Sequence, residues 1–311
     1  MAENTVKKIA TRESYGNSLK ELAEEFPNLV VLDADLAAAT KTGIFRKAYP
    51  DRHIDCGIAE ENMMGVAAGL SLVGKIPFVS SFAMFAAGRA FEQVRNSIGY
   101  PHLNVKIGAT HAGITVGEDG ATHQCNEDIA LMRTIPGMVV MCPSDDVEAR
   151  AAVRAALEYE GPVYIRFGRA AVPVINDHPG YHFEIGKGTV VREGKDVTIV
   201  ATGICVDSAL GAAKLLEEEG ISAEVVNICT IKPLDEEIIL NSAKKTGKVV
   251  TVEEHSVIGG LGSAVCDCLC AHYPVPVKKV GMQDVFGESG SAASLVEKYG
   301  LDAKGVYKSV K

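Results

Sequence analysis

The stretch I76-P-F-V-S-S-F-A-M-F-A-A-G-R-A-F-E-Q-V-R-N-S-I-G-Y-P-H-L-N-V-K-I107 indicates the fold of this chain. A short apolar run at 76–79 is followed by a helical pattern over 86–98 and a second apolar run at 104–107. Apolar runs of this length are typical of buried strands, and two strands joined by a helix form the unit of parallel sheets. We therefore predict a mostly parallel sheet with helices on both faces.

The same alternation continues on both sides of this stretch. Further strands are predicted at 29–32, 138–141 and 162–165, and further helices at 14–26, 61–72 and 145–158. Two prolines and three glycines break the pattern over 172–192, which reads as a connector leading into a short extended segment. Alternation then resumes with strands at 197–202, 223–227, 248–252 and 277–280 and a helix near 206–218. We predict an α/β protein of two doubly wound domains, residues 1–180 and a smaller domain of residues 190–311.

Composition narrows the classes of function. The 311 residues are 47% apolar and 23% charged, and their net charge of −9 argues against non-specific binding to nucleic acid or to an anionic membrane. The first residues, M1-A-E-N-T-V-K-K8, have no apolar core of the kind a signal peptide needs, and no apolar run is long enough to span a bilayer. We expect a cytoplasmic protein.

The eight cysteines are scattered through the chain, several inside apolar runs, and we expect them to be reduced core residues. Cys266, Cys268 and Cys270 lie near His272, but alternate residues of a helix point to opposite faces. No second pair of cysteines or histidines completes a closed zinc site. We therefore predict no metal site in this chain.

The stretch T110-H-A-G-I-T-V-G-E-D-G-A-T-H-Q124 follows an apolar strand and combines histidines, acids and glycines. Glycines let a backbone approach a ligand closely, and loops held by a rigid sheet often carry functional side chains. Histidine ordinarily titrates near neutral pH, which suits it for hydrogen bonding and proton transfer during a reaction. We predict that His111, Asp119 and His123 line a site for a polar small molecule.

The stretch C56-G-I-A-E-E-N-M-M-G-V-A-A-G-L70 places Glu60 and Glu61 at the start of an apolar, presumed buried helix. Acids are favoured at a helix N-terminus by the helix dipole, so capping explains them. Burial also disfavours the charged form of a carboxyl group and lets it share a proton with a ligand. The residues alone leave capping and catalysis equally open.

Aromatic and basic residues complete the candidate site. Phe82 and Phe85 follow a strand end, which is usual for core residues but is also where open α/β folds bind ligands. Arg12 precedes the first predicted helix, and Arg166 and Arg169 flank the end of the last strand of the first domain. Arginine is often salt-bridged in such places, but its planar fork of donors also suits phosphate.

Together these motifs resemble the C-terminal half of a transketolase, in the form in which two genes encode the enzyme. C-G-I-A-E-E-N-M resembles the glutamate segment of the family, G-E-D-G-A-T-H-Q its substrate loop and F-A-M-F-A-A-G-R its pyrimidine pocket. Arg12 lies twenty-three residues before Asp35, and the C-terminal K279-V-G-M-Q-D-V-F-G-E-S-G290 also fits the family pattern. The resemblance implies a pyrimidine-binding domain followed by a transketolase C-terminal domain.

The resemblance also implies an activity. Transketolases transfer a two-carbon ketol unit from a ketose phosphate to an aldose phosphate with thiamine diphosphate, in the pentose phosphate pathway. Glu60 would hydrogen-bond the aminopyrimidine of the cofactor, Phe82 and Phe85 would stack on it, and Asp35 would lie nearby. The implied catalytic residues are Glu60, His111 and His123, and the implied substrate-binding residues are Arg12, His111, Asp119, His123 and Arg169. Arg166 is the alternative phosphate ligand if the alignment is shifted.

Two departures from the family pattern affect these expectations. The G-D-G motif that holds diphosphate and Mg²⁺ in the family is absent, and G117-E-D-G120 is not that motif. We therefore expect Mg²⁺ on an N-terminal partner subunit and a dimer of heterodimers, a heterotetramer. Ala39 stands where many members carry a phosphate-binding serine, and Thr40 or Thr42 could replace it.

Three alternatives remain open. The β subunit of a 2-oxo-acid dehydrogenase has the same two domains and a similar glutamate, but a different substrate loop. Deoxyxylulose-phosphate synthase shares G-I-A-E and T-H-Q, but is normally one long chain with a different spacing around the aromatic pair. The third alternative is a non-catalytic scaffold that only binds a partner chain, which would not require the set of polar site residues.

Overall fold

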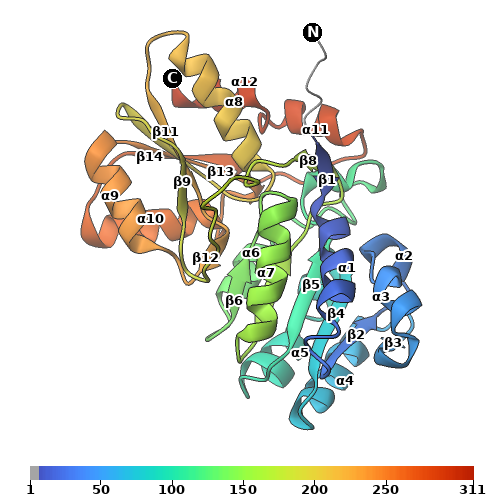
Figure 1. Cartoon of the computed structure of the whole chain (residues 1–311). Helices are drawn as coiled ribbons and strands as arrows, with labels where there is room; N and C mark the ends of the chain where they lie inside the picture. The colour runs from blue at the N-terminus through green and yellow to red at the C-terminus, as the bar shows by residue number, and fades with distance from the viewer. Residues whose placement is uncertain (1–6) are drawn as a thin grey trace.

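The computed structural model describes residues 7–311, which form two large sheets with helices on both faces (Figure 1) and one small two-stranded sheet. Within the described chain the first sheet has seven strands in the order β12-β6-β7-β5-β4-β2-β3, all parallel except β12. Their bounds are β2 (Leu29–Asp33), β3 (His53–Asp55), β4 (Ile76–Phe82), β5 (Lys106–Thr110), β6 (Val139–Met141), β7 (Val163–Arg166) and β12 (Thr230–Lys232).

The second sheet has five strands among the described residues, in the order β14-β13-β10-β11-β9. It is parallel apart from β9, which pairs antiparallel with β11. The bounds are β9 (Thr189–Arg192), β10 (Val197–Ala201), β11 (Ala223–Asn227), β13 (Val249–Ser256) and β14 (Val277–Met282). Two mostly parallel sheets confirm the predicted α/β class.

Helices cover both faces of the first sheet. Tyr15 and Leu19 of α1 (Thr11–Leu22) and Ala152 of α7 (Asp146–Glu158) belong to one buried cluster, with α3 (Gly43–Ala48) beside them. Met63 and Met64 belong to a second cluster on the other face. That face carries α4 (Glu60–Leu72), the π-helical turns η2 (Met84–Arg89) and η3 (Val94–Gly99), α5 (Phe91–Gln93) and α6 (Asp128–Arg133). The short turns are α2 (Ala37–Thr40), η1 (Pro50–Arg52) and η4 (Ile114–Asp119).

The second sheet is covered in the same way. One face packs on α8 (Cys205–Glu217), α11 (Ala292–Lys298) and α12 (Ala303–Val310), and the other on α9 (Glu236–Thr246) and α10 (Leu261–His272). Four helices of the described chain are preceded by a capping residue whose side-chain oxygen accepts a backbone N–H of the first turn: Asp145, Asp235, Ser291 and Asp302. The cluster that buries Met63 also includes Leu261, so one core runs through both halves of the chain.

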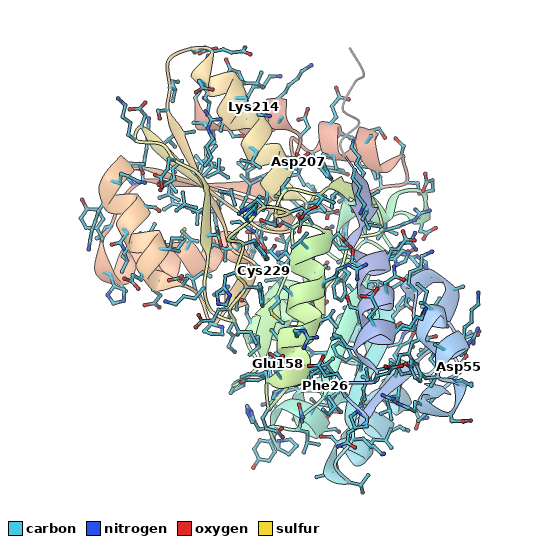
Figure 2. All side chains as sticks on the ribbon, viewed as in Figure 1. Phe26, Asp55, Glu158, Asp207, Lys214 and Cys229 are labelled. Carbon is cyan, nitrogen blue, oxygen red and sulfur yellow. The ribbon has the colours of Figure 1, made fainter. Side chains whose placement is uncertain are left out.

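Three short pairings differ from the sequence-based expectation. The strand β1 (Lys8–Ala10) pairs antiparallel with β8 (Ala171–Pro173), and β3 extends the first sheet at one edge. At the opposite edge β12, which belongs to the second half of the chain, pairs with β6. Figure 2 labels Cys229, which leads into β12, close to the junction of the two halves. Strands of three residues carry too little periodicity to be recognised in a sequence.

The expectation of no signal peptide rests largely on residues 1–6, which lie outside the described part of the chain. From residue 7 onward, no helix is both long and apolar enough to cross a bilayer.

Candidate active site

The predicted site residues lie at the carboxyl edge of the first sheet. Asp35 follows β2, Glu60 follows β3, Phe82 ends β4 and His111 follows β5. Arg169 follows β7 at the same edge. In open α/β folds the loops beyond the carboxyl ends of the strands form the ligand site. The sheet therefore brings together residues that are more than 130 positions apart in the sequence.

Four aromatic rings form one cluster at this edge. The ring of Phe82 stacks on that of His111, with centroids 3.9 Å apart and planes 22° apart. Phe82 and Phe85 are also near parallel, with centroids separated by 6.0 Å. His123 meets Phe85 edge-on at 5.5 Å. The two phenylalanines and the two histidines thus form a compact aromatic surface, on which a flat ring can stack.

Glu60 is the first residue of α4, and its side chain is 2% exposed. Its Oε2 accepts a hydrogen bond from Nη1 of Arg89 at 2.9 Å. The guanidinium of Arg89 also lies over the ring of Phe85, 4.5 Å from its centroid. Glu61, the next residue, is exposed. Helix α4 is buried only on the side of Met63 and Met64. The expectation of a fully buried helix, which rested on its apolar sequence, is therefore wrong.

Arg89 was missed by the sequence analysis, although it ends the quoted F-A-M-F-A-A-G-R89 motif. Its position in the π-helical turn η2 places its guanidinium beside the aromatic pair. The signal that could have found it is chemical, because a buried carboxylate needs a partner and Arg89 is the single arginine of the aromatic motif.

His111 is 3% exposed and lies between Arg12 and Thr110. Because arginine can only donate, Nη1 of Arg12 donates to Nε2 of His111 at 3.3 Å, and Nδ1–H then faces Oγ1 of Thr110 at 2.9 Å. Burial, followed by the charge of Arg12, lowers the pKa of His111 to about 3. The expectation of near-neutral titration is wrong for this histidine, which is a neutral acceptor at its Nε2.

Arg169 keeps a partly exposed guanidinium, with 37% of its side chain accessible. Its Nη1 donates to the backbone oxygen of Val116 and to Oε2 of Glu118, the latter at 2.8 Å. The charge of Arg169 also acts on Arg12, whose pKa is lowered by burial and then by this repulsion. Two positive side chains held near one another favour an anion between them.

The β1–β8 pairing explains how Arg12 comes to this place. The backbone N–H of Arg12 donates to the oxygen of Gly168 at 3.4 Å, and the N–H of Gly168 donates to Oγ1 of Thr11 at 2.8 Å. The start of α1 is thereby fastened to the residue before Arg169. The pairing, which the sequence analysis missed, thus places both arginines at one end of the sheet.

Arg166 belongs to the buried core and is no alternative phosphate ligand. Its side chain is 5% exposed, and its Nε donates to Oδ2 of Asp128 at 2.9 Å. Its Nη2 donates to the backbone oxygens of Glu254 at 2.7 Å and of Cys125 at 3.3 Å. These partners occupy the fork, so the alternative assignment is wrong.

Thr40 and Thr42 are also unavailable to a substrate. Both residues are fully buried, and their hydroxyls donate to Oδ2 of Asp33 at 3.0 Å and 2.9 Å. Burial raises the pKa of Asp33, a carboxyl that the sequence analysis did not single out. Ala39 offers its backbone oxygen to Nη1 of Arg12 at 2.8 Å. Neither threonine therefore replaces the serine of other family members.

The remaining predicted residues differ in exposure. Asp119 and Asp35 are exposed, and the backbone of Asp35 adopts a positive φ of 61° while its N–H donates to Asp55. His123 is half-buried, with Nδ1 2.9 Å from Oγ1 of Thr122. His123 belongs to the aromatic cluster, and Asp119 is an exposed residue at the end of η4 in the same loop.

Residues 7–311 contain no group of three histidine, cysteine or acidic side chains placed to hold a metal ion. All eight cysteines have free thiols, and of the C-terminal three Cys268 is buried whereas Cys270 is exposed. This agrees with the opposite faces expected for alternate residues of α10.

Comparison with known proteins gives a family for both halves of the chain. Residues 7–174 match the family described as transketolase, pyrimidine binding domain, and residues 186–306 match transketolase, C-terminal domain. A putative transketolase C-terminal section of Methanocaldococcus jannaschii is 52% identical over 301 residues, covering 96% of this chain and 94% of the relative.

Two further similar proteins also match over almost their whole length. A 6-deoxy-6-sulfo-D-fructose transketolase subunit of a Clostridium species is 49% identical over 298 residues, covering 96% of this chain and 92% of the relative. A solved structure described as a split gene transketolase, inactive β4 tetramer, is 58% identical with a TM-score of 0.89, covering 98% and 97% of the two chains. The chain belongs to the transketolase family, as the C-terminal section of a split transketolase.

Proposed function

We propose that this chain, joined by an N-terminal subunit, transfers a two-carbon ketol unit from a ketose phosphate to an aldose phosphate. The observation that carries the proposal is the meeting of Glu60, the Phe82–Phe85 pair, both histidines and two arginines at one sheet edge. A scaffold that only bound a partner would gain nothing from burying a carboxylate and a neutral histidine beside that aromatic surface.

The donor set fits the pyrimidine end of thiamine diphosphate, the cofactor that the family implies. A buried carboxyl at the rim of an aromatic surface can hydrogen-bond a ring nitrogen, and Phe82 and Phe85 offer faces for stacking. When bound, the cofactor supplies the carbanion chemistry of ketol transfer. Glu60 would hold a proton at the pyrimidine nitrogen, Arg89 would have to share or release the carboxylate, and the exposed Asp35 would lie near the ring.

The substrate would lie between the aromatic surface and the two arginines. Arg12 and Arg169 would hold its terminal phosphate, and a substrate hydroxyl would replace Arg12 as the donor to Nε2 of the neutral His111. His123 would exchange a proton with the reacting oxygen, and Asp119 would accept the C2 hydroxyl and so select the sugar configuration. A relative named for a sulfonated sugar supports a preference for tetrahedral anions without fixing which sugar is used.

The proposal also includes the assembly of the enzyme and its place in the cell. We place Mg²⁺ and the diphosphate on the N-terminal subunit and expect a dimer of heterodimers, since this chain carries no G-D-G motif. Eight free thiols support a reducing cytoplasmic compartment. The domain limits at 180 and 190 and the pentose phosphate pathway are further parts of this proposal.

Reconstitution tests the proposal. The chain alone should show no ketol transfer, and mixing it with its N-terminal subunit, thiamine diphosphate and Mg²⁺ should restore it. Glu60→Gln should then lower kcat at least ~100-fold, on the scale of general acid–base catalysis, while the exposed Glu61→Gln should change it little. Turnover by the chain alone, or equal losses in both variants, would contradict the proposal. The product profile separates ketol transfer from the oxidative and deoxyxylulose-forming alternatives.

A further inference from the structure

The substrate loop, residues 110–124, packs against the C-terminal domain. At its start, the N–H of Thr115 donates to Oε1 of Glu254 at 2.6 Å, and Glu254 is buried at the end of β13. Gly113 has a positive φ of 73°, and a Cβ there would lie 2.4 Å from Cδ of Glu254. The absence of a side chain at Gly113 is therefore required by this contact.

The middle of the substrate loop contacts a second segment of the C-terminal domain, residues 287–291. Helix α11, which follows this segment, packs against η4 of the loop. A Cβ on Gly117 would lie 3.3 Å from the oxygen of Gly290, and one on Gly120 would lie 2.5 Å from Oγ of Ser289. The glycines of the loop thus let the two domains approach closely, in addition to any role toward a ligand.

Gln124 joins the end of the loop to that same segment. Its Nε2 donates to the backbone oxygens of Glu288 at 2.9 Å, Ile114 at 3.2 Å and Gly117 at 3.3 Å. The side chain is 2% exposed, and a Cβ on Gly287 would lie 1.8 Å from its Oε1. One buried amide therefore holds the start and the middle of η4 and the C-terminal segment together. The T-H-Q motif in the sequence did not reveal this role of Gln124.

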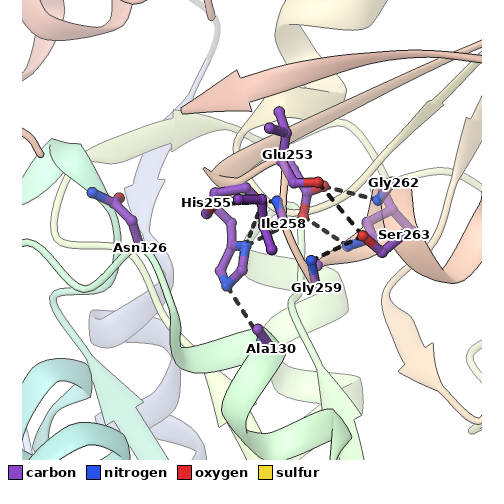
Figure 3. Close-up of polar contacts among 12 residues, drawn as sticks. Asn126, Ala130, Glu253, His255, Ile258, Gly259, Gly262 and Ser263 are labelled. Atoms are coloured by element: carbon purple, nitrogen blue, oxygen red, sulfur yellow. Dashed lines mark hydrogen bonds and ion pairs between the residues drawn. The ribbon is translucent and has the colours of Figure 1, made fainter. Parts of the chain in front are cut away.

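The residues after the loop are fastened to the end of β13 (Figure 3). The N–H of Ser256 donates to the oxygen of Asn126 at 2.8 Å, and the N–H of Ala130 donates to Nε2 of His255 at 3.3 Å. Glu253, which alternates with Glu254 along the strand, instead accepts the N–H groups of Leu261 and Gly262 at 2.7 Å and 2.8 Å. The glycine-rich turn at 259–263 is thus occupied by an internal carboxylate and holds β13 in place.

We propose that the C-terminal domain sets the geometry of the substrate loop, with Gln124 and Glu254 as positioning residues. The histidines and Asp119 of the loop then depend on the C-terminal domain, whereas Glu60, Phe82 and Phe85 belong to the first domain. Disturbing this contact misplaces groups that face the substrate and leaves cofactor binding intact. The expected effect on kinetics rests on the proposed function, whereas the expected effect on the structure of the loop does not.

Amide hydrogen exchange of the chain itself provides the first test. Gly287→Ala pushes the buried Gln124 from its three acceptors, and Gln124→Met removes the donors without adding bulk. Both variants should exchange the amides of residues 114–120 at least tenfold faster than the unaltered chain, with little change in β4 and α4. Glu297→Ala, exposed on α11, is the control and should match the unaltered chain. Unchanged exchange in two folded variants would overturn the inference.

Kinetics of the reconstituted enzyme provide the second test. Misplacing a reacting group by about 1 Å can cost roughly 100-fold, so we expect kcat to fall ten- to a hundredfold in Gly287→Ala and Gln124→Met. Discrimination between C2 epimers of the acceptor should fall as well, and thiamine diphosphate affinity should stay within twofold. A parallel loss of cofactor affinity would also overturn the inference. If the unaltered pair shows no ketol transfer, the proposed function fails, and hydrogen exchange alone still decides this inference.

Discussion

Arg166 is the last residue of β7 and Arg169 follows three positions later, yet only Arg169 keeps donors for a ligand. Arg166 gives its fork to Asp128 and to two backbone oxygens inside the protein. Arg169 is held through one nitrogen, Nη1, by Val116 and Glu118, and more than a third of its side chain is exposed. The two arginines therefore differ in role because Arg166 is buried with its partners, whereas Arg169 is partly exposed.

Substitution of the two arginines should therefore have opposite signatures. Arg169→Ala should raise KM for phosphorylated sugars about 10- to 100-fold, the loss of a charge-assisted contact worth ~1.5–3 kcal/mol, with little effect on unphosphorylated ones. Arg166→Ala should instead lower the free energy of unfolding by about 3–5 kcal/mol, because it leaves Asp128 buried without its partner. Steady-state kinetics and denaturant unfolding measure the two effects. Equal impairment of both substrate classes by Arg169→Ala would assign it to structure.

The lowered pKa of His111 makes a pH prediction. The unfolded histidine titrates near 6.5 and the folded one near 3, so the unfolded state binds the extra proton between these values. The stability from a neutral His111 is fully present above about pH 6.5 and is lost as pH falls toward 3, by about 1.4 kcal/mol per pH unit. His111→Gln should show a shallower loss between pH 6 and 4. Parallel pH profiles for variant and unaltered chain would contradict this.

Motifs in the sequence predicted which residues meet, but not the state in which they meet. Glu60, Phe82, His111 and Arg169 lie at one edge of the first sheet. The neutrality of His111 could not be predicted, because it arises from burial and from Arg12, 99 positions away. The orientation of the Thr40 and Thr42 hydroxyls toward Asp33 could not be predicted either, because the sequence does not say whether a threonine faces solvent or the protein.

Helices and strands fix the site through close approaches between elements. Gly108 of β5 faces Tyr15 of α1, and a Cβ there would lie 2.4 Å from the tyrosine ring and hydroxyl. Tyr15 is fully buried, and its hydroxyl lies 2.5 Å from Oγ of Ser80 in β4. Because α1 carries Arg12 at its start and β5 leads to His111, this single contact fixes the spacing between two site residues.

Gly108→Ala should accordingly destabilise the fold and the site together. We expect a loss of about 1–3 kcal/mol in the free energy of unfolding, the usual cost of overpacking a core. Gly65→Ala in α4 is the matched control, since an added Cβ there meets nothing within 4 Å and should be neutral or slightly stabilising. Denaturant midpoints of the two variants measure the difference, and similar midpoints would show that β5 and α1 can separate without cost.

Long elements were predictable and short edge pairings were not. The periodic stretches 14–26, 61–72 and 145–158 correspond to α1, α4 and α7, because each buries one face in a large core. The β1–β8 pair and β12 are three-residue strands whose pairing depends on distant parts of the chain. The stretch 86–98 also forms π-helical turns rather than one regular α-helix, a distinction that hydrophobic spacing does not make.

Across the whole molecule, the two halves share a sheet edge and a core. Strand β12 covers β6, and Ile231 within it is 1% exposed in the same cluster as Met132. A fragment of residues 1–180 should therefore leave β6 as an unpaired edge and expose apolar surface. We expect it to self-associate and to bind a hydrophobic dye, as measured by size-exclusion chromatography and fluorescence. A monomeric fragment with cooperative unfolding would contradict this.

The pairing of β12 with β6 also affects how the chain folds during its synthesis. Residues up to Arg166 complete the rest of the first sheet, but its last strand ends only at Lys232. At synthesis rates of about 5–20 residues per second, the nascent chain waits roughly 3–13 s with β6 open on the ribosome. During that interval a neighbouring nascent chain could add its own strand to the open edge. Slow translation before residue 232 should therefore reduce the yield of correctly folded chain more than slow translation after it.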